Sequence, residues 1–70
     1  MNKQLLTKFG RRVREERLKR DLSQEKLAAL AKVHRTYIGM IERAEKNITL
    51  SNMEKISKAL GITLTELIDF

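Results

Sequence analysis

The sequence contains no cysteine, no proline and no tryptophan, and only three of its 70 residues are glycine. Without cysteine the chain can form neither a disulfide nor a thiolate metal site, and its single histidine has no second histidine to share a metal ion with. Residues that interrupt helices are scarce, while leucine, isoleucine, alanine, lysine, arginine and glutamate dominate. The composition therefore predicts one all-α domain over residues 1–70, stabilised by packing between helices.

Long apolar runs are also absent. No run approaches the roughly 20 residues that span a membrane. The first residues, Met-Asn-Lys-Gln-Leu-Leu-Thr-Lys, lack the apolar centre of a signal peptide. We therefore expect a cytoplasmic protein with no membrane partner. No two carboxylates, histidines or nucleophiles are spaced to cooperate in catalysis, so the sequence predicts no enzyme, no metal, no cofactor and no small-molecule ligand.

Acidic residues are too few to balance the basic ones. Fifteen Lys and Arg face nine Asp and Glu, which gives a formal net charge of +6. A positive field of this size on a small body favours a polyanion as partner. A basic surface can also serve solubility alone, and an anionic membrane surface or a single-stranded RNA would attract the same charge. Charge by itself leaves these alternatives open.

What the sequence does contain is a central pair of short amphipathic helices, within residues 23–43. Ser23 can cap the first helix, and Glu25 places negative charge at its positive end. The apolar stripe of this helix consists of Leu27, Ala28, Leu30 and Ala31. The apolar pattern pauses at residues 32–34 and resumes in a new phase with Ile38 and Ile41. Two helices joined by so short a turn cross steeply, which leaves the polar face of the second free to contact a partner.

This pair resembles the helix-turn-helix of the Cro/C1 or XRE-type family. The resemblance lies in Ser-Gln-Glu-Lys-Leu-Ala at 23–28, Arg-Thr-Tyr-Ile at 35–38, Ile-Glu-Arg at 41–43 and Ile-Ser-Lys-Ala-Leu-Gly-Ile at 56–62. It covers nearly the whole chain and implies a five-helix, lambda-repressor-like domain that binds double-stranded DNA.

Within that family, the sequence is most similar to the controller proteins of restriction-modification systems. Arg-Thr-Tyr-Ile, Ile-Glu-Arg and a following Asn-Ile-Thr-Leu carry this likeness. It implies a dimeric transcriptional regulator that binds operators near its own gene and the endonuclease gene. Small phage-type repressors and antitoxins share the fold and are an alternative. A module whose second central helix docks a protein partner is an alternative from another class.

The residues expected to read the DNA sequence lie on the second central helix. Arg35 and Thr36 fall at its tip, which enters the major groove first in a docked helix-turn-helix. An arginine can pair with guanine O6 and N7, and a threonine methyl can contact a thymine methyl. Arg43, at the other end of this helix, can reach a base edge or a phosphate.

A second group of residues is expected to contact the DNA backbone. The family resemblance implies a phosphate contact by Gln24 in the first turn of its helix, although Gln24 could instead help to cap that helix. His34 can reach a phosphate, and Lys46 and Asn47 lie in a loop that approaches the backbone or the groove. Tyr37 could direct its hydroxyl to the DNA backbone, or it could be core with one solvated edge.

A structural ion pair is implied between Arg17 and Glu42, joining a first helix over residues 5–19 to the end of the second central helix. A buried charge is tolerated only when paired, so removal of one partner is expected to cost about 3 to 5 kcal/mol. Gly10 weakens the first helix by about 1 kcal/mol relative to alanine unless close packing requires it. The apolar side of that helix is predicted to contain Leu6, Phe9, Val13 and Leu18.

The sequence departs from the family pattern at three positions. Many relatives have Gly where Lys32 and Ala44 stand, and Pro where Ile48 stands. Lys32 is expected at a left-handed position. Whether Ala44 keeps the left-handed cap that glycine favours is open from the sequence alone.

Two capping boxes are predicted downstream, at Ser51 with Glu54 and at Thr63 with Glu66. The first would begin a helix that buries Met53, Ile56 and Leu60 and stops at Gly61, and the second would begin a short last helix.

The apolar end of the chain is a candidate dimer contact, formed by Leu64, Leu67, Ile68 and Phe70 with Leu50. Leu64 and Leu67 could instead close the core of the monomer. Two copies would place two recognition helices about 34 Å apart on a palindromic operator. Contact with RNA polymerase would need exposed acidic residues, and the candidates are Glu25, Glu45 and Glu54.

Overall fold

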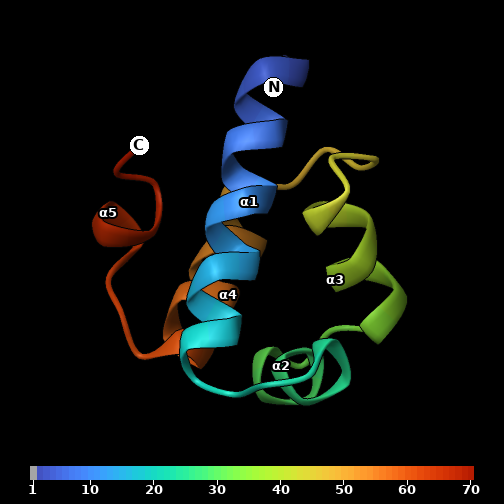
Figure 1. Ribbon diagram of the computed structural model, residues 1–70, viewed down its shortest axis with the longest axis vertical. Coiled ribbons are helices and arrows are strands. Elements are labelled where there is room, and N and C mark those ends of the chain that lie inside the picture. The colour runs from blue at the N-terminus through green and yellow to red at the C-terminus, as the bar shows by residue number, and fades with distance from the viewer. Residues whose placement is uncertain (1) are drawn as a thin grey trace.

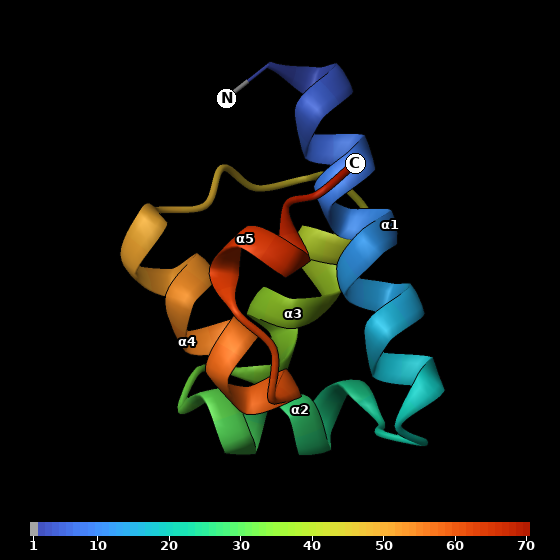
Figure 2. The same cartoon turned by 90° about the vertical axis from the view of Figure 1, so that its left-hand side faces the viewer.

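Helices make up most of the chain in the computed structural model, which describes residues 2–70 and contains no strand within them. The five helices are α1 (Lys3–Lys19), α2 (Gln24–Ala31), α3 (Arg35–Glu42), α4 (Leu50–Leu60) and α5 (Leu64–Leu67). α4 lies behind α1 in Figure 1, and Figure 2 shows that these two helices stand on opposite sides of the molecule, with α3 and α5 between them. α2 lies across the lower end of the molecule in both views. The two ends of the chain lie at the end of the molecule away from α2 (Figure 2). The all-α, five-helix prediction is confirmed.

The same connection precedes three of the helices. In each, a residue with positive φ is followed by an apolar residue and then by the residue whose side chain caps the helix. The three connections are Asp21, Leu22 and Ser23 before α2, Lys32, Val33 and His34 before α3, and Gly61, Ile62 and Thr63 before α5. Lys32 has φ 59° and therefore lies in the left-handed region, as its replacement of a family glycine predicted. Ala44 also keeps the left-handed conformation, with φ 57°.

Helices α2 to α5 each begin with the apolar spacing of a hydrophobic staple. The apolar residue before the cap and the fourth residue after it both belong to the core or pack against it, which fixes the angle at which the chain enters the helix. The four pairs are Leu22 with Leu27, Val33 with Ile38, Ile48 with Met53, and Ile62 with Leu67. Each staple therefore draws the start of its helix into the single core.

The predicted capping box at Ser51 and Glu54 is wrong. The cap of α4 is Thr49, whose hydroxyl accepts a hydrogen bond from the backbone N–H of Asn52 at 3.1 Å. A helix begun at Ser51 would place exposed Leu50 and Lys55 at the staple positions, whereas a helix begun at Thr49 buries Ile48 and Met53. The second predicted box, Thr63 with Glu66, is confirmed.

Gly10 lies where α1 approaches α3 most closely. A Cβ atom built on Gly10 would lie 2.3 Å from the carbonyl oxygen of Ile41 and 3.0 Å from that of Glu42. Close packing therefore requires a glycine in the middle of this helix. Beside it, Phe9 and Val13 are fully buried, but Leu18, which was expected on the apolar side, is 52% exposed. α1 also begins at Lys3, two residues earlier than predicted, with Asn2 as its cap.

A buried carboxylate on α1, which was not predicted from the sequence, pairs with the arginine that connects α1 to α5. Glu16 is paired with Arg12 and accepts hydrogen bonds from Lys19 Nζ and Arg20 Nη1, each at 2.9 Å. The hydrogen bonds from Lys19 and Arg20 lower the pKa of Glu16. Arg12 also donates to the carbonyl oxygen of Glu66 at 3.0 Å. Arg12 thereby links the Glu16 cluster to the last helix.

Candidate nucleic-acid interface

An open groove of about 610 Å³ runs between the start of α2 and the exposed side of α3. Its walls combine cations, polar side chains and one glycine, and they are Arg17, Ser23, Gln24, Glu25, Arg35, Thr36, Gly39 and Arg43. Five of the eight come from sites that the sequence singled out as DNA-binding or as the structural ion pair. The helix-turn-helix geometry therefore brings four of the eight predicted DNA-binding residues to one surface, namely Gln24, Arg35, Thr36 and Arg43.

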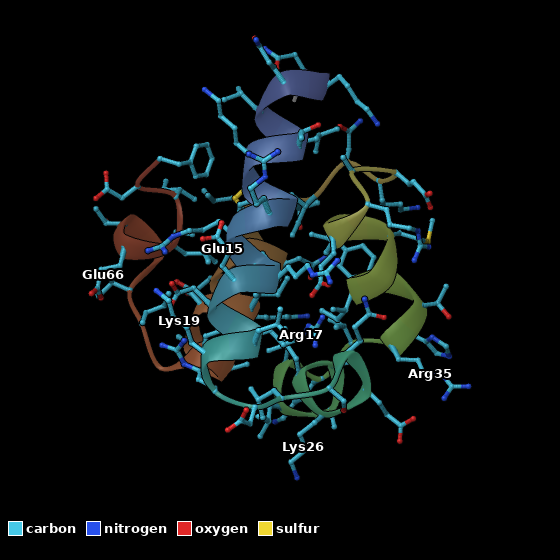
Figure 3. All side chains as sticks on the ribbon, in the orientation of Figure 1. Glu15, Arg17, Lys19, Lys26, Arg35 and Glu66 are labelled. Atoms are coloured by element: carbon cyan, nitrogen blue, oxygen red, sulfur yellow. The ribbon has the colours of Figure 1, made fainter. Side chains whose placement is uncertain are left out.

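The tip of α3 is held in place by its own cap. His34 Nδ1 accepts a hydrogen bond from the backbone N–H of Thr36 at 3.1 Å, so this ring faces the helix start. Arg35 and Thr36 follow the cap and are exposed. The Arg35 side chain projects away from the body of the protein (Figure 3). The same hydrogen bond leaves His34 Nε2 as the ring nitrogen that can meet a phosphate.

Arg35 is paired across the groove with an acidic residue of α2. Its Nη1 donates to Glu25 Oε2 at 2.9 Å, and the two side chains remain 67% and 73% exposed. Because both groups are largely hydrated, this ion pair contributes little to the stability of the fold. The contact joins the first turn of α2 to the tip of α3.

The floor of the groove is a polar network that joins three helices. Arg17 Nε and Nη2 donate to the two carboxylate oxygens of Glu42 at 2.7 and 3.0 Å, which confirms the predicted ion pair. The hydrogen bond to Glu42 raises the pKa of Arg17. Gln24 Nε2 donates to Glu42 Oε1 at 3.1 Å. Ser23 is the cap of α2, so the alternative in which the Gln24 side chain caps that helix is not what the structure contains.

Gly39 leaves room for two of the candidate DNA-binding side chains. A Cβ atom built on it would lie 3.0 Å from Arg43 Nη1 and 3.4 Å from Gln24 Oε1. Gly39 is buried beneath those two side chains. Arg43 lies over it and pairs with Glu45 at 3.1 Å.

The loop after α3 is exposed at Lys46 and Asn47. It is fastened to the start of α1, because Lys3 Nζ donates to the carbonyl oxygen of Ala44 at 2.9 Å. Tyr37 is half-buried and packs against the core, and its hydroxyl accepts a hydrogen bond from Asn52 Nδ2 at 3.0 Å. The ring thus packs on the domain in the way both interpretations of Tyr37 required.

The predicted dimer residues divide into two groups. Leu67 is fully buried, and Leu64 is partly buried against the core. The alternative in which these two residues close the core of the monomer is therefore correct. Leu67 has no exposed surface for a second copy to contact. Leu50, Ile68 and Phe70 are 68%, 42% and 49% exposed. Together with Leu5, Phe9 and Met53 they line an apolar hollow of about 340 Å³.

Leu5 was missed in the sequence reasoning, although its spacing of four from Phe9 was a usable signal. We call Leu5, Leu50, Ile68 and Phe70 the apolar patch.

The three acidic candidates for a polymerase contact all lie in exposed ion pairs. Glu25 pairs with Arg35, Glu45 with Arg43, and Glu54 with Lys58 at 3.7 Å. Over residues 2–70, no helix has both the length and the apolar character needed to cross a bilayer, and no three His, Asp or Glu side chains gather as metal ligands.

Comparison with known proteins agrees with this geometry. The sequence pattern of the helix-turn-helix family matches residues 13–67. The control protein C.BamHI from Bacillus amyloliquefaciens is 56% identical over 63 residues, which cover 89% of this chain and 78% of that protein. The control protein C.MunI from Mycoplasma sp is 49% identical over 61 residues, which cover 86% of this chain and 82% of that protein.

A solved structure gives the same result at the level of the fold. The restriction-modification controller protein C.AhdI from Aeromonas hydrophila superimposes with a TM-score of 0.87 at 47% identity, over 89% of this chain and 94% of that chain. The sequence motifs, the packing of α2 against α3 and these similarities lead to one assignment. The chain belongs to the Cro/C1-type helix-turn-helix family, within the group of restriction-modification controller proteins.

Proposed function

We propose that the protein is a sequence-specific regulator of transcription that binds, as a homodimer, a palindromic operator near its own gene and the gene of a restriction endonuclease. The observation that carries this proposal is the exposed tip of α3. Arg35 and Thr36 project there from a helix that is fixed by its cap, by the staple Val33 with Ile38, and by the Arg17–Glu42 pair. A rigid, cationic helix start of this kind fits the major groove.

Base reading is assigned to Arg35, Thr36 and Arg43, and backbone contact to a second set. That second set is Gln24, His34, Tyr37, Lys46 and Asn47. Phosphate contacts release counterions, so affinity should fall with salt by about 0.9 logarithmic units per neutralised phosphate for each tenfold increase in salt. The net charge of +6 supports this dependence.

The dimer is assigned to the apolar patch. Its exposed leucine, isoleucine and phenylalanine side chains come from α1, the start of α4 and the end of the chain. A contiguous apolar surface rimmed by polar residues is typical of an association site. A two-fold contact there would give the complex the symmetry of a palindrome.

The test is selection of bound duplexes from a random pool, followed by affinity measurements on the selected duplex and on a scrambled duplex. We expect an enriched sequence with two inverted halves. Arg35→Ala should lose about 1 to 3 kcal/mol of binding free energy on the selected duplex and little on the scrambled one. Lys55→Ala, which removes a charge from an exposed position on α4, is the matched control and should affect both duplexes alike.

Two results would count against the proposal. Recovery of no preferred sequence would exclude specific recognition. An equal loss by Arg35→Ala on the selected and scrambled duplexes would show that Arg35 only holds the backbone.

A further inference from the structure

The ion pair between Glu25 and Arg35 joins the first turns of the two helices of the helix-turn-helix. Neither side chain is buried, and the pair contributes little to folding. Glu25 is in the first turn of α2, where the helix dipole stabilises a negative charge. A carboxylate at this place lies on a surface that would face a polyanion, and it would repel the phosphates. A contribution of Glu25 to binding would have to offset that repulsion.

The contact uses only one corner of the guanidinium. Glu25 Oε2 accepts from Nη1 of Arg35, at 2.9 Å. Arginine carries five N–H donors in one plane. The edge formed by Nε and Nη2 is therefore not engaged by Glu25, and this edge has the two parallel donors that fit guanine O6 and N7.

We propose that Glu25 is a positioning residue for sequence recognition: it holds Arg35 through Nη1 so that the Nε and Nη2 edge meets a guanine. This inference rests on the function proposed above. An exposed arginine otherwise samples many rotamers, and fixing it on binding reduces the affinity. Glu25 reduces the entropic cost of ordering Arg35 on binding, because it favours one orientation of the guanidinium in the free protein.

Two other candidate DNA-binding side chains in the groove also contact a carboxylate. Gln24 is hydrogen-bonded to Glu42, and Arg43 is paired with Glu45. Glu42 is buried in the Arg17 network and serves the fold, and Glu45 is only two residues from Arg43 in the same loop. Glu25 is the one of these three whose carboxylate reaches from a different helix to the tip of α3, so its role can be tested separately.

The experiment measures dissociation constants of the full chain on the selected duplex and on a scrambled duplex. Glu25→Gln should weaken binding to the selected duplex by about three- to tenfold, the size expected for freeing one long side chain. Glu25→Asp keeps the charge but draws the carboxylate back by one methylene, so it should also weaken binding to the selected duplex and leave the scrambled duplex unchanged.

Glu15→Gln is the matched control. Glu15 is exposed on α1 and points away from Arg35 (Figure 3), and its substitution changes the net charge by the same amount. It should tighten binding to both duplexes equally, through charge alone. In an Arg35→Ala background, Glu25→Gln should behave like Glu15→Gln, since the side chain that Glu25 positions is gone.

The outcomes separate this inference from the proposed function. If Glu25→Gln matches Glu15→Gln on both duplexes, or tightens the selected duplex more, Glu25 does not position Arg35, while the regulator function stands. If the wild-type protein does not distinguish the two duplexes, the proposed function itself fails.

Discussion

Among single residues, Glu42 shows most clearly how one side chain beneath the groove joins three helices. It accepts two hydrogen bonds from Arg17 of α1 and one from Gln24 of α2, while it belongs to α3. The Arg17 and Glu42 side chains are only 10% and 4% exposed. Arg17 Nη1 also donates to the carbonyl oxygen of Leu22 at 2.8 Å. A nearly buried charge with all its partners present is stable, but the loss of one partner leaves an uncompensated charge.

We therefore expect Glu42→Ala to lower the free energy of unfolding by about 3 to 5 kcal/mol, measured by urea denaturation. The double variant Arg17→Met/Glu42→Leu, which replaces both charges with apolar groups of similar volume, should recover most of that loss. A Glu42→Ala variant that unfolds at nearly the wild-type urea concentration would show that water, rather than Glu42, satisfies Arg17.

The sequence could predict this pair only through the family resemblance. Twenty-five residues separate Arg17 from Glu42, and periodicity places each on its own helix without saying that the two helices meet. Glu25 and Arg35 illustrate the same limit. Arg35 was assigned from its place at a helix tip, but its acidic partner depends on the angle at which α2 crosses α3, which no local pattern encodes.

At the scale of the helices, local signals predicted which segments fold and erred where two signals competed. Thr49 and Ser51 can both cap a helix, and a glutamate three residues after Ser51 favoured the wrong one. Thr49 is the cap because a helix that begins there buries Ile48 and Met53. The last helix had only one candidate, Thr63, and was predicted correctly. Leu67 is fully buried because α5 packs against the rest of the domain, and the apolar pattern of the sequence did not reveal that packing.

The contact of α1 with α3 gives a prediction at this scale. Alanine has a higher helix propensity than glycine, so Gly10→Ala by itself should stabilise α1 by about 1 kcal/mol. Its methyl group, however, would meet the backbone oxygens of Ile41 and Glu42. Backbone cannot move aside as a side chain can, so we expect a net loss of about 1 to 3 kcal/mol in the free energy of unfolding.

Gly39→Ala is the matched comparison for this substitution. Its methyl group would meet the ends of the Arg43 and Gln24 side chains, which can shift. The free energy of unfolding should therefore not fall, and it can rise by up to about 1 kcal/mol through the higher helix propensity of alanine. Thermal unfolding of both variants checks the difference, and an equally stable Gly10→Ala protein would mean that α1 can withdraw from α3 at no cost.

In the whole molecule, the exposed tip of α3 and the apolar patch lie on different parts of the surface. The patch is built from the start of α1, the start of α4 and the end of the chain, at the end where both termini lie (Figure 1). The start of α2 and the tip of α3 lie toward the other end, in a body of 27 × 23 × 21 Å. A two-fold contact through the patch would therefore leave both tips exposed, and their separation would set the spacing of the operator halves.

The apolar patch gives the prediction for the assembly. Leu50→Ser/Phe70→Ser should sediment as a monomer at tens of micromolar, a concentration at which we expect the wild-type protein to sediment as a dimer. Its affinity for a single operator half should be unchanged, while its affinity for the full palindrome should fall by about 10- to 100-fold, because the second half is no longer bound by a tethered copy. Leu18→Ser/Leu30→Ser removes two comparably exposed leucines outside the patch and should remain a dimer. If both double variants sediment as the wild-type protein does and bind the palindrome equally well, the patch is not the dimer contact, and another surface must bring the two recognition helices together.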